Sequence, residues 1–155
     1  MLLPFFEWLN ALPVSQAIGG SIWVYPFIQA IHLVFLALLA GAILIVDLRL
    51  LGVTMRSQPL AQVARDARVW FVVGLIGMIC TGIPQLMQNA SREYYSEYFW
   101  YKMYLIAFGV IFTFTVRRKV TQAAETTVTG KIVGLVSIAV WGSVVVNARL
   151  IGLFT

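Results

Sequence analysis

The single histidine of this 155-residue chain, His32, lies inside a long apolar run. A neutral imidazole can bind haem iron or another metal ion through one ring nitrogen. At ~1.5 Å per residue, His32 lies about 16 Å along a helix that starts at Ser21, near the middle of a bilayer. An ionisable group at that depth is costly and therefore commonly functional. Three interpretations stay open: haem ligation, a proton or metal relay, and a plain hydrogen bond to a neighbouring helix.

Other polar side chains are expected in the same half of the membrane. Gln29 precedes His32 by one helical turn, and Asn147, Arg149 and Lys102 lie near the outer ends of later apolar runs. Lys102 and Arg149 could neutralise the propionates of a haem b bound to His32. They could instead extend to the lipid headgroups or pair with glutamates. The candidate cofactor-binding residues are thus His32, Lys102, Arg149, Gln29 and Asn147, with His32 as the candidate metal ligand.

A ligating imidazole also needs a partner for its second ring nitrogen, which fixes the orientation of the ring. Gln29 is a poor candidate because it lies on the same helix only three residues earlier. Thr81 or Ser137, each on another apolar run, is better placed in principle.

A charged residue at the opposite boundary of the first apolar run could form an ion pair with another helix. Asp47 follows the run directly, and Arg117 and Arg118 follow the third run. Asp47 could pair with either arginine and fix the first helix to the third. A simple stop signal at the membrane boundary is the alternative.

The composition indicates a membrane protein rather than a soluble one. Hydrophobic residues make up 61% of the chain and charged residues only 11%, with a mean hydropathy of +0.89. A soluble domain of this size could not bury so much apolar surface. The net charge of +5 does not indicate nucleic-acid binding, because the basic residues lie between apolar runs rather than along one face.

The pattern predicts an all-α fold: an integral membrane four-helix bundle with an N-terminal interfacial amphipathic helix. Residues 1–20 are the interfacial segment, too short and too interrupted by Pro4 and Pro13 to span. Residues 21–155 are the four-helix domain, with spans at about 21–46, 69–87, 99–116 and 132–154.

The distribution of Lys and Arg predicts the orientation. Eight of the 11 basic residues fall between the first and second spans or between the third and fourth. The positive-inside rule places those loops in the cytoplasm, and both termini then face outward. We expect a multi-pass protein of the bacterial inner membrane.

Small residues spaced three or four apart predict close helix packing, chiefly within the bundle. They are Gly74, Gly77 and Thr81 in the second span, and Ala37 and Gly41 in the first. A small bundle of this kind is also expected to form a homo-oligomer or to join a larger membrane complex.

Two short segments carry a family resemblance. Ile31-His32-Leu33, followed by Asp47-Leu48-Arg49-Leu50-Leu51-Gly52, and the segment Phe99-Trp100-Tyr101-Lys102 resemble small bacterial four-helix membrane proteins of an uncharacterised family. More distantly, the layout is similar to copper-resistance D-type proteins and to haem-binding membrane protoporphyrinogen oxidases. The second resemblance implies His32 as a haem ligand and Lys102 as a functional cation. The chain departs from that group in having no second histidine, which excludes bis-histidine ligation within one subunit.

These observations lead to the expectation of a membrane haem b protein that transfers electrons with quinone or a partner oxidoreductase. The alternatives are a non-enzymatic accessory or assembly subunit, and a copper or proton conduit. The sequence lacks a phosphate-binding glycine loop, a His-Glu-x-x-His motif and a nucleophile elbow, so it names no enzyme class.

Overall fold

The computed structural model describes residues 2–122 and 127–154, and this part of the chain consists of helices and short connections, without a strand. Four helical segments in it are long and apolar enough to cross a membrane. They are α3 (Val24–Leu50), α4 (Leu60–Gln88), the continuous segment Glu97–Thr121, and α8 (Val128–Phe154). The segment Glu97–Thr121 comprises α6 (Glu97–Phe112), η1 (Thr113–Arg117) and α7 (Arg118–Thr121). The predicted all-α fold of a multi-pass membrane protein is confirmed.

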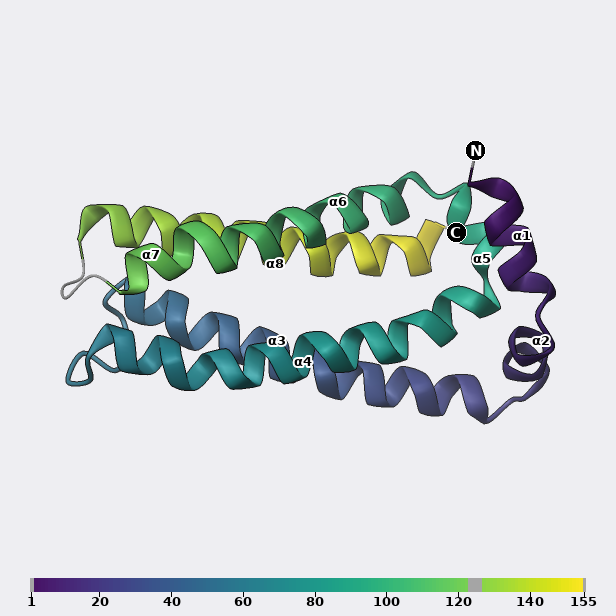
Figure 1. The fold of residues 1–155 in the computed structure, drawn as a ribbon, viewed down its shortest axis with the longest axis horizontal. Helices are drawn as coiled ribbons and strands as arrows, with labels where there is room; N and C mark the ends of the chain where they lie inside the picture. The colour runs from purple at the N-terminus through teal and green to yellow at the C-terminus, as the bar shows by residue number, and fades with distance from the viewer. Residues whose placement is uncertain (1, 123–126, 155) are drawn as a thin grey trace.

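The four long helices form two pairs that lie against each other. α3 packs along α4, α6 packs along α8, and α3 also contacts α8 (Figure 1). Apolar side chains fill the middle of the bundle, with Leu39 and Ile43 from α3, Phe71 from α4 and Trp141 from α8 at the centre. Large apolar side chains also cover the outside, where only 11–33% of the most apolar window of each helix is buried. Lipid is the solvent that suits such a surface.

α3 ends in a well-formed C-cap beyond the apolar run. Gly52 adopts φ +75°, the left-handed conformation that favours glycine. The N–H of Val53 donates to Leu48 O at 2.9 Å and that of Gly52 to Arg49 O at 3.0 Å, the pair of bonds of a Schellman motif. Arg49 then donates to Gln58 O, which closes the connection between α3 and α4.

The helices extend further at this end than the apolar runs indicate. α4 begins at Leu60 rather than at residue 69, because its first two turns are amphipathic. Leu60, Val63 and Ala67 are buried there, whereas Arg65 is exposed. Counting apolar residues finds only the part of a helix that lipid surrounds, and it misses an amphipathic extension.

The N-terminal segment forms two short helices where one was expected. α1 (Leu3–Ala11) and α2 (Pro13–Gly20) are separated at Leu12, whose extended backbone (ψ 137°) is the conformation favoured before a proline. They cover one end of the bundle together with α5 (Ala90–Tyr94), and the end of α8 lies there too (Figure 1). Phe6 packs there against Phe99, and the Ser15 hydroxyl donates to Met87 O.

Candidate functional site

His32 is half-buried on the α4 side of α3, and a hydrogen bond fixes its ring. Its Nδ1 lies 2.7 Å from Oγ1 of Thr81. The Thr81 hydroxyl donates its own proton to Gly77 O, at 2.6 Å, so its oxygen is left to accept from the imidazole. The bond therefore assigns the proton of a neutral His32 to Nδ1. Nε2 then carries a free lone pair, which is the arrangement of a metal-ligating histidine.

Two glycines of α4 let α3 come close enough for this bond. A Cβ at Gly74 would lie 2.9 Å from the backbone nitrogen of Leu39, and one at Gly77 would lie 2.2 Å from the ring of Phe35. The predicted packing role of Gly74, Gly77 and Thr81 within the bundle thus agrees with the structure. Gly41 does not have this packing role, because nothing lies within 4 Å of its Cβ position and it is exposed on α3.

Lys102 joins His32 from the opposite pair of helices. It is half-buried on α6, with Nζ 5.1 Å from the centre of the Phe99 ring, and lies within electrostatic range of both His32 and Glu93. Glu93, on α5, interacts in turn with Tyr25 at the start of α3. Burial raises the pKa of Glu93 above its usual value, although the charges of Lys102 and Arg92 lower it. A polar cluster of Tyr25, His32, Thr81, Glu93 and Lys102 therefore occupies this half of the bundle.

The other three predicted site residues lie outside the contacts of this cluster. Gln29 is half-buried one turn before His32 on α3. The Asn147 side chain donates to Ser143 O of its own helix at 2.9 Å. Arg149 is exposed, and at ~100° per residue it points about 140° away from the buried Val144 on α8. Sequence position could not set the rotation of α8.

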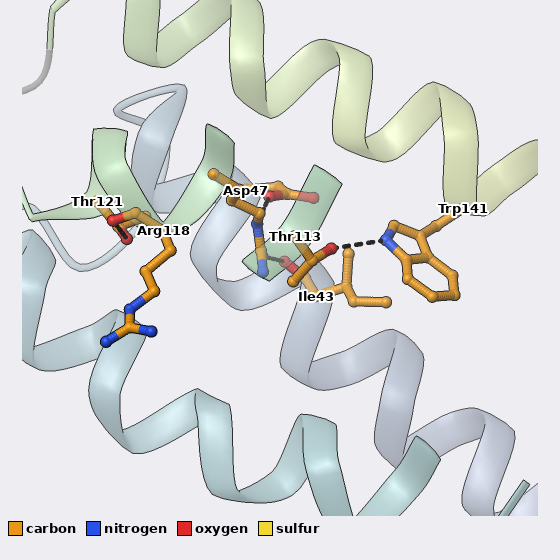
Figure 2. A network of polar contacts seen from close by, with 7 residues as sticks. Ile43, Asp47, Thr113, Arg118, Thr121 and Trp141 are labelled. Atoms are coloured by element: carbon orange, nitrogen blue, oxygen red, sulfur yellow. Dashed lines mark hydrogen bonds and ion pairs between the residues drawn. The ribbon is translucent and has the colours of Figure 1, made fainter. Parts of the chain in front are cut away.

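The second candidate site is a buried ion pair near the opposite end. Arg117 Nε lies 2.8 Å from Asp47 Oδ1, and Arg117 Nη2 donates to Ile43 O at 2.8 Å (Figure 2). Asp47 is 0% exposed and Arg117 is 6% exposed. The pairing of Asp47 with Arg117, one of the two arginines predicted, is confirmed. Asp47 Oδ2 and the neighbouring Ser137 Oγ are buried without a hydrogen-bond partner of normal geometry.

A π-helical turn, η1, aims Arg117 at this carboxylate. Gly109, Thr113, Arg117 and Thr121 are all buried, one every four residues. In a regular α-helix each step of four residues turns by ~40°, so Thr121 would lie ~120° from Gly109. The extra residue of a π-turn removes about 100° of that drift and keeps all four on one face. This π-turn was not predicted, although the strict spacing of small and polar residues by four is a signal for it.

Possible metal ligands are sparse in the structure. Across residues 2–122 and 127–154, no three His, Cys, Asp or Glu side chains gather where they could hold a metal ion. Cys80 is exposed on α4. Haem supplies four nitrogen ligands of its own, so it needs only a single imidazole as an axial ligand.

Comparison with known proteins places almost the whole chain in one group. The model of a family of unknown function, DUF6644, matches residues 5–154. No match was found among curated proteins or among solved structures.

Proposed function

We propose that this chain, which belongs to the DUF6644 family, is a haem b protein that uses His32 as an axial ligand and transfers electrons with quinone or a partner oxidoreductase. The observation that carries the proposal is the bond from His32 Nδ1 to Thr81, because it leaves Nε2 free as a ligand on an oriented ring. Bound haem would supply the one-electron chemistry.

Lys102 is the cation that supports the proposal. It is half-buried and close enough to His32 to interact with it electrostatically. A half-buried ammonium would offset the charge of a haem propionate at reduced dielectric. Arg149 is exposed on α8, so we assign this role to Lys102.

A continuous proton conduit is less well supported. His32 and Asp47 are the polar centres of the two halves, and 15 residues of α3 correspond to about 22 Å. The apolar cluster around Leu39, Phe71 and Trp141 lies between them. A proton relay needs a chain of polar groups or water across such a layer, whereas electron transfer does not.

An absorption spectrum of the purified protein, expressed with ample haem, tests the proposal. We expect a Soret band that shifts on reduction with dithionite. His32→Ala should abolish it, and Lys102→Ala should shift the haem potential. Thr81→Val should weaken haem retention by about 10–100-fold, since it removes the group that orients the ring.

Thr115→Val is the matched control, because it also removes a hydroxyl that donates to a carbonyl of its own helix, Ile111 O, but at an exposed position away from His32, and it should keep the band. A wild-type protein without Soret absorption, or a His32→Ala variant that retains it, would refute haem ligation. The first result would favour the alternative function, a non-enzymatic accessory or assembly subunit.

We further propose that the protein lies in a bacterial inner membrane with both termini outside. The start of α1 and the end of α8 share an end of the bundle, and the ends of α3 and α7 lie at the other (Figure 1). The latter end carries eight of the 11 Lys and Arg residues: Arg49, Arg56, Arg65, Arg68, Arg117, Arg118, Lys119 and Lys131. The positive-inside rule supports a cytoplasmic location for that end.

Association with a second copy or a larger membrane complex completes the proposal. Ala37 and Gly41 are both exposed on α3, four residues apart, and do not serve packing inside the bundle. Small residues at this spacing on a lipid-facing surface let another helix approach closely.

A further inference from the structure

A small pocket lies at the basic end of the bundle, away from His32. Its volume is about 60 Å³. Three arginines line it: Arg68 from α4, Arg117 from η1 and Arg118 from α7. The remaining wall is mostly apolar and includes Val46, Phe71 and Phe114. The pocket thus combines basic groups with an apolar wall.

In the described part of the chain, two of the three arginines have no carboxylate partner. Arg117 is paired with Asp47. Among the described residues, neither Arg68 nor Arg118 lies within 4.0 Å of a carboxylate. The Arg68 guanidinium carbon lies 5.8 Å from the centre of the Phe114 ring. The Arg118 side chain extends away from Asp47 (Figure 2). An anion is the ligand that complements this pair of charges.

The pocket has room for a phosphate group. Its volume of about 60 Å³ is several times the ~10–15 Å³ that a cavity needs to hold one water molecule. Guanidinium groups bind phosphate oxygens through paired N–H donors.

The surroundings favour a phosphate that belongs to a lipid. Val69, Trp70 and Val116 adjoin Arg68 and Arg117 in sequence and are exposed. Acyl chains can lie along such side chains while the headgroup reaches the arginines. Basic pockets between transmembrane helices commonly bind anionic lipid headgroups.

We propose that the pocket formed by Arg68, Arg117 and Arg118 binds the phosphate of an anionic phospholipid from the adjacent leaflet. The complementary charge, the room for a phosphate group and the apolar wall together point to this ligand. This site is independent of His32 and of any haem.

Native mass spectrometry of the full chain, released from nanodiscs of phosphatidylglycerol and phosphatidylethanolamine, tests the proposal. The wild type should retain phosphatidylglycerol preferentially. Arg68→Gln and Arg118→Gln should each weaken retention about fivefold, and together about 25-fold, as expected for one basic contact each. The matched control is Arg65→Gln with Lys119→Gln, which removes two charges from the same end without touching the pocket and should retain the lipid.

Three outcomes would overturn the proposal. If the control double variant and the Arg68→Gln/Arg118→Gln variant lose phosphatidylglycerol equally, the basic surface in general attracts the lipid. Equal retention of the two lipids by the wild type would show no anionic preference. The third outcome combines two measurements. If the protein binds inorganic phosphate in nanodiscs of pure phosphatidylethanolamine and does not retain phosphatidylglycerol from the mixed nanodiscs, the ligand is a soluble phosphate instead. Circular dichroism of each variant separates loss of lipid from loss of fold.

Discussion

At the scale of single residues, Asp47 and Arg117 depend on each other more than any other two charged groups in the described structure. Both are buried, and the arginine also satisfies the backbone oxygen of Ile43. A buried ion pair adds little net stability compared with apolar residues, but its loss leaves an uncompensated charge. Loss of either partner alone should therefore disturb the packing of α3 against η1.

Arg117→Ala should therefore destabilise the protein by about 3–5 kcal/mol, because Asp47 would stay buried without its partner. Thermal unfolding in mild detergent measures the change. Lys119→Ala, at an exposed position two residues later, should change stability by no more than ~0.5 kcal/mol. Replacing both partners, Asp47→Leu with Arg117→Met, should recover most of the loss. Similar melting temperatures for the two single variants would contradict this role.

Glu93 predicts a pH dependence with a definite sign. Burial raises its pKa in the folded state above the usual 4.5. Protonated Glu93 therefore makes its full contribution to the stability of the fold at low pH, and this contribution is lost as the pH rises through the folded-state pKa. Glu93→Gln resembles the protonated form, so it should raise the melting temperature at about pH 7 and have little effect near pH 4. Glu97→Gln, at an exposed position, is the control, and an equal effect of Glu93→Gln at both pH values would contradict the prediction.

Individual contacts were predictable where the sequence offered few partners. Thr81 was one of two candidates for His32, and Arg117 one of two for Asp47; the structure selects one in each case. The orientation of Arg149 was not predictable, because the rotation of α8 depends on which of its faces packs against α3 and α6.

At the scale of elements, the close approach of α3 and α4 depends on glycine. The Cβ of an alanine at Gly74 would lie 2.9 Å from a backbone atom of Leu39, and a backbone cannot move aside as a side chain can. Gly74→Ala should force the helices apart and cost about 1–3 kcal/mol.

Thermal unfolding tests this prediction with Gly142→Ala as the control. Nothing lies within 4 Å of the Cβ position of Gly142, so alanine there should be neutral or stabilising by up to ~1 kcal/mol. If Gly74→Ala is as stable as the control, the contact is looser than the structure shows.

The elements themselves were only partly predictable. Hydropathy located all four long helices, since runs of apolar residues are what a bilayer requires. It could not show that α4 starts at Leu60, because amphipathic turns carry no such run. Pro13 signals the break between α1 and α2, because proline favours the first turn of a helix; the sequence predicts one interrupted helix there, and the structure has two.

At the scale of the whole molecule, the proposed orientation can be tested by labelling. In a Cys80→Ser background, Arg56→Cys should resist an impermeant thiol reagent in intact cells and react after permeabilisation. Tyr95→Cys, exposed at the opposite end, should react in intact cells. The reverse pattern would invert the topology.

The π-turn at Thr113–Arg117 also leaves a record that sequence comparison can detect. In a relative that is one residue shorter before this arginine, a regular α-helix would place the arginine about −20° from Gly109, which is still the same face. In a relative of equal length, a regular helix would turn the arginine by about 80° and leave an acid at the position of Asp47 buried alone. Relatives that keep the acid should therefore have either the extra residue in a π-turn or a one-residue gap before the arginine, so that the length of one helix reports the charge carried by another.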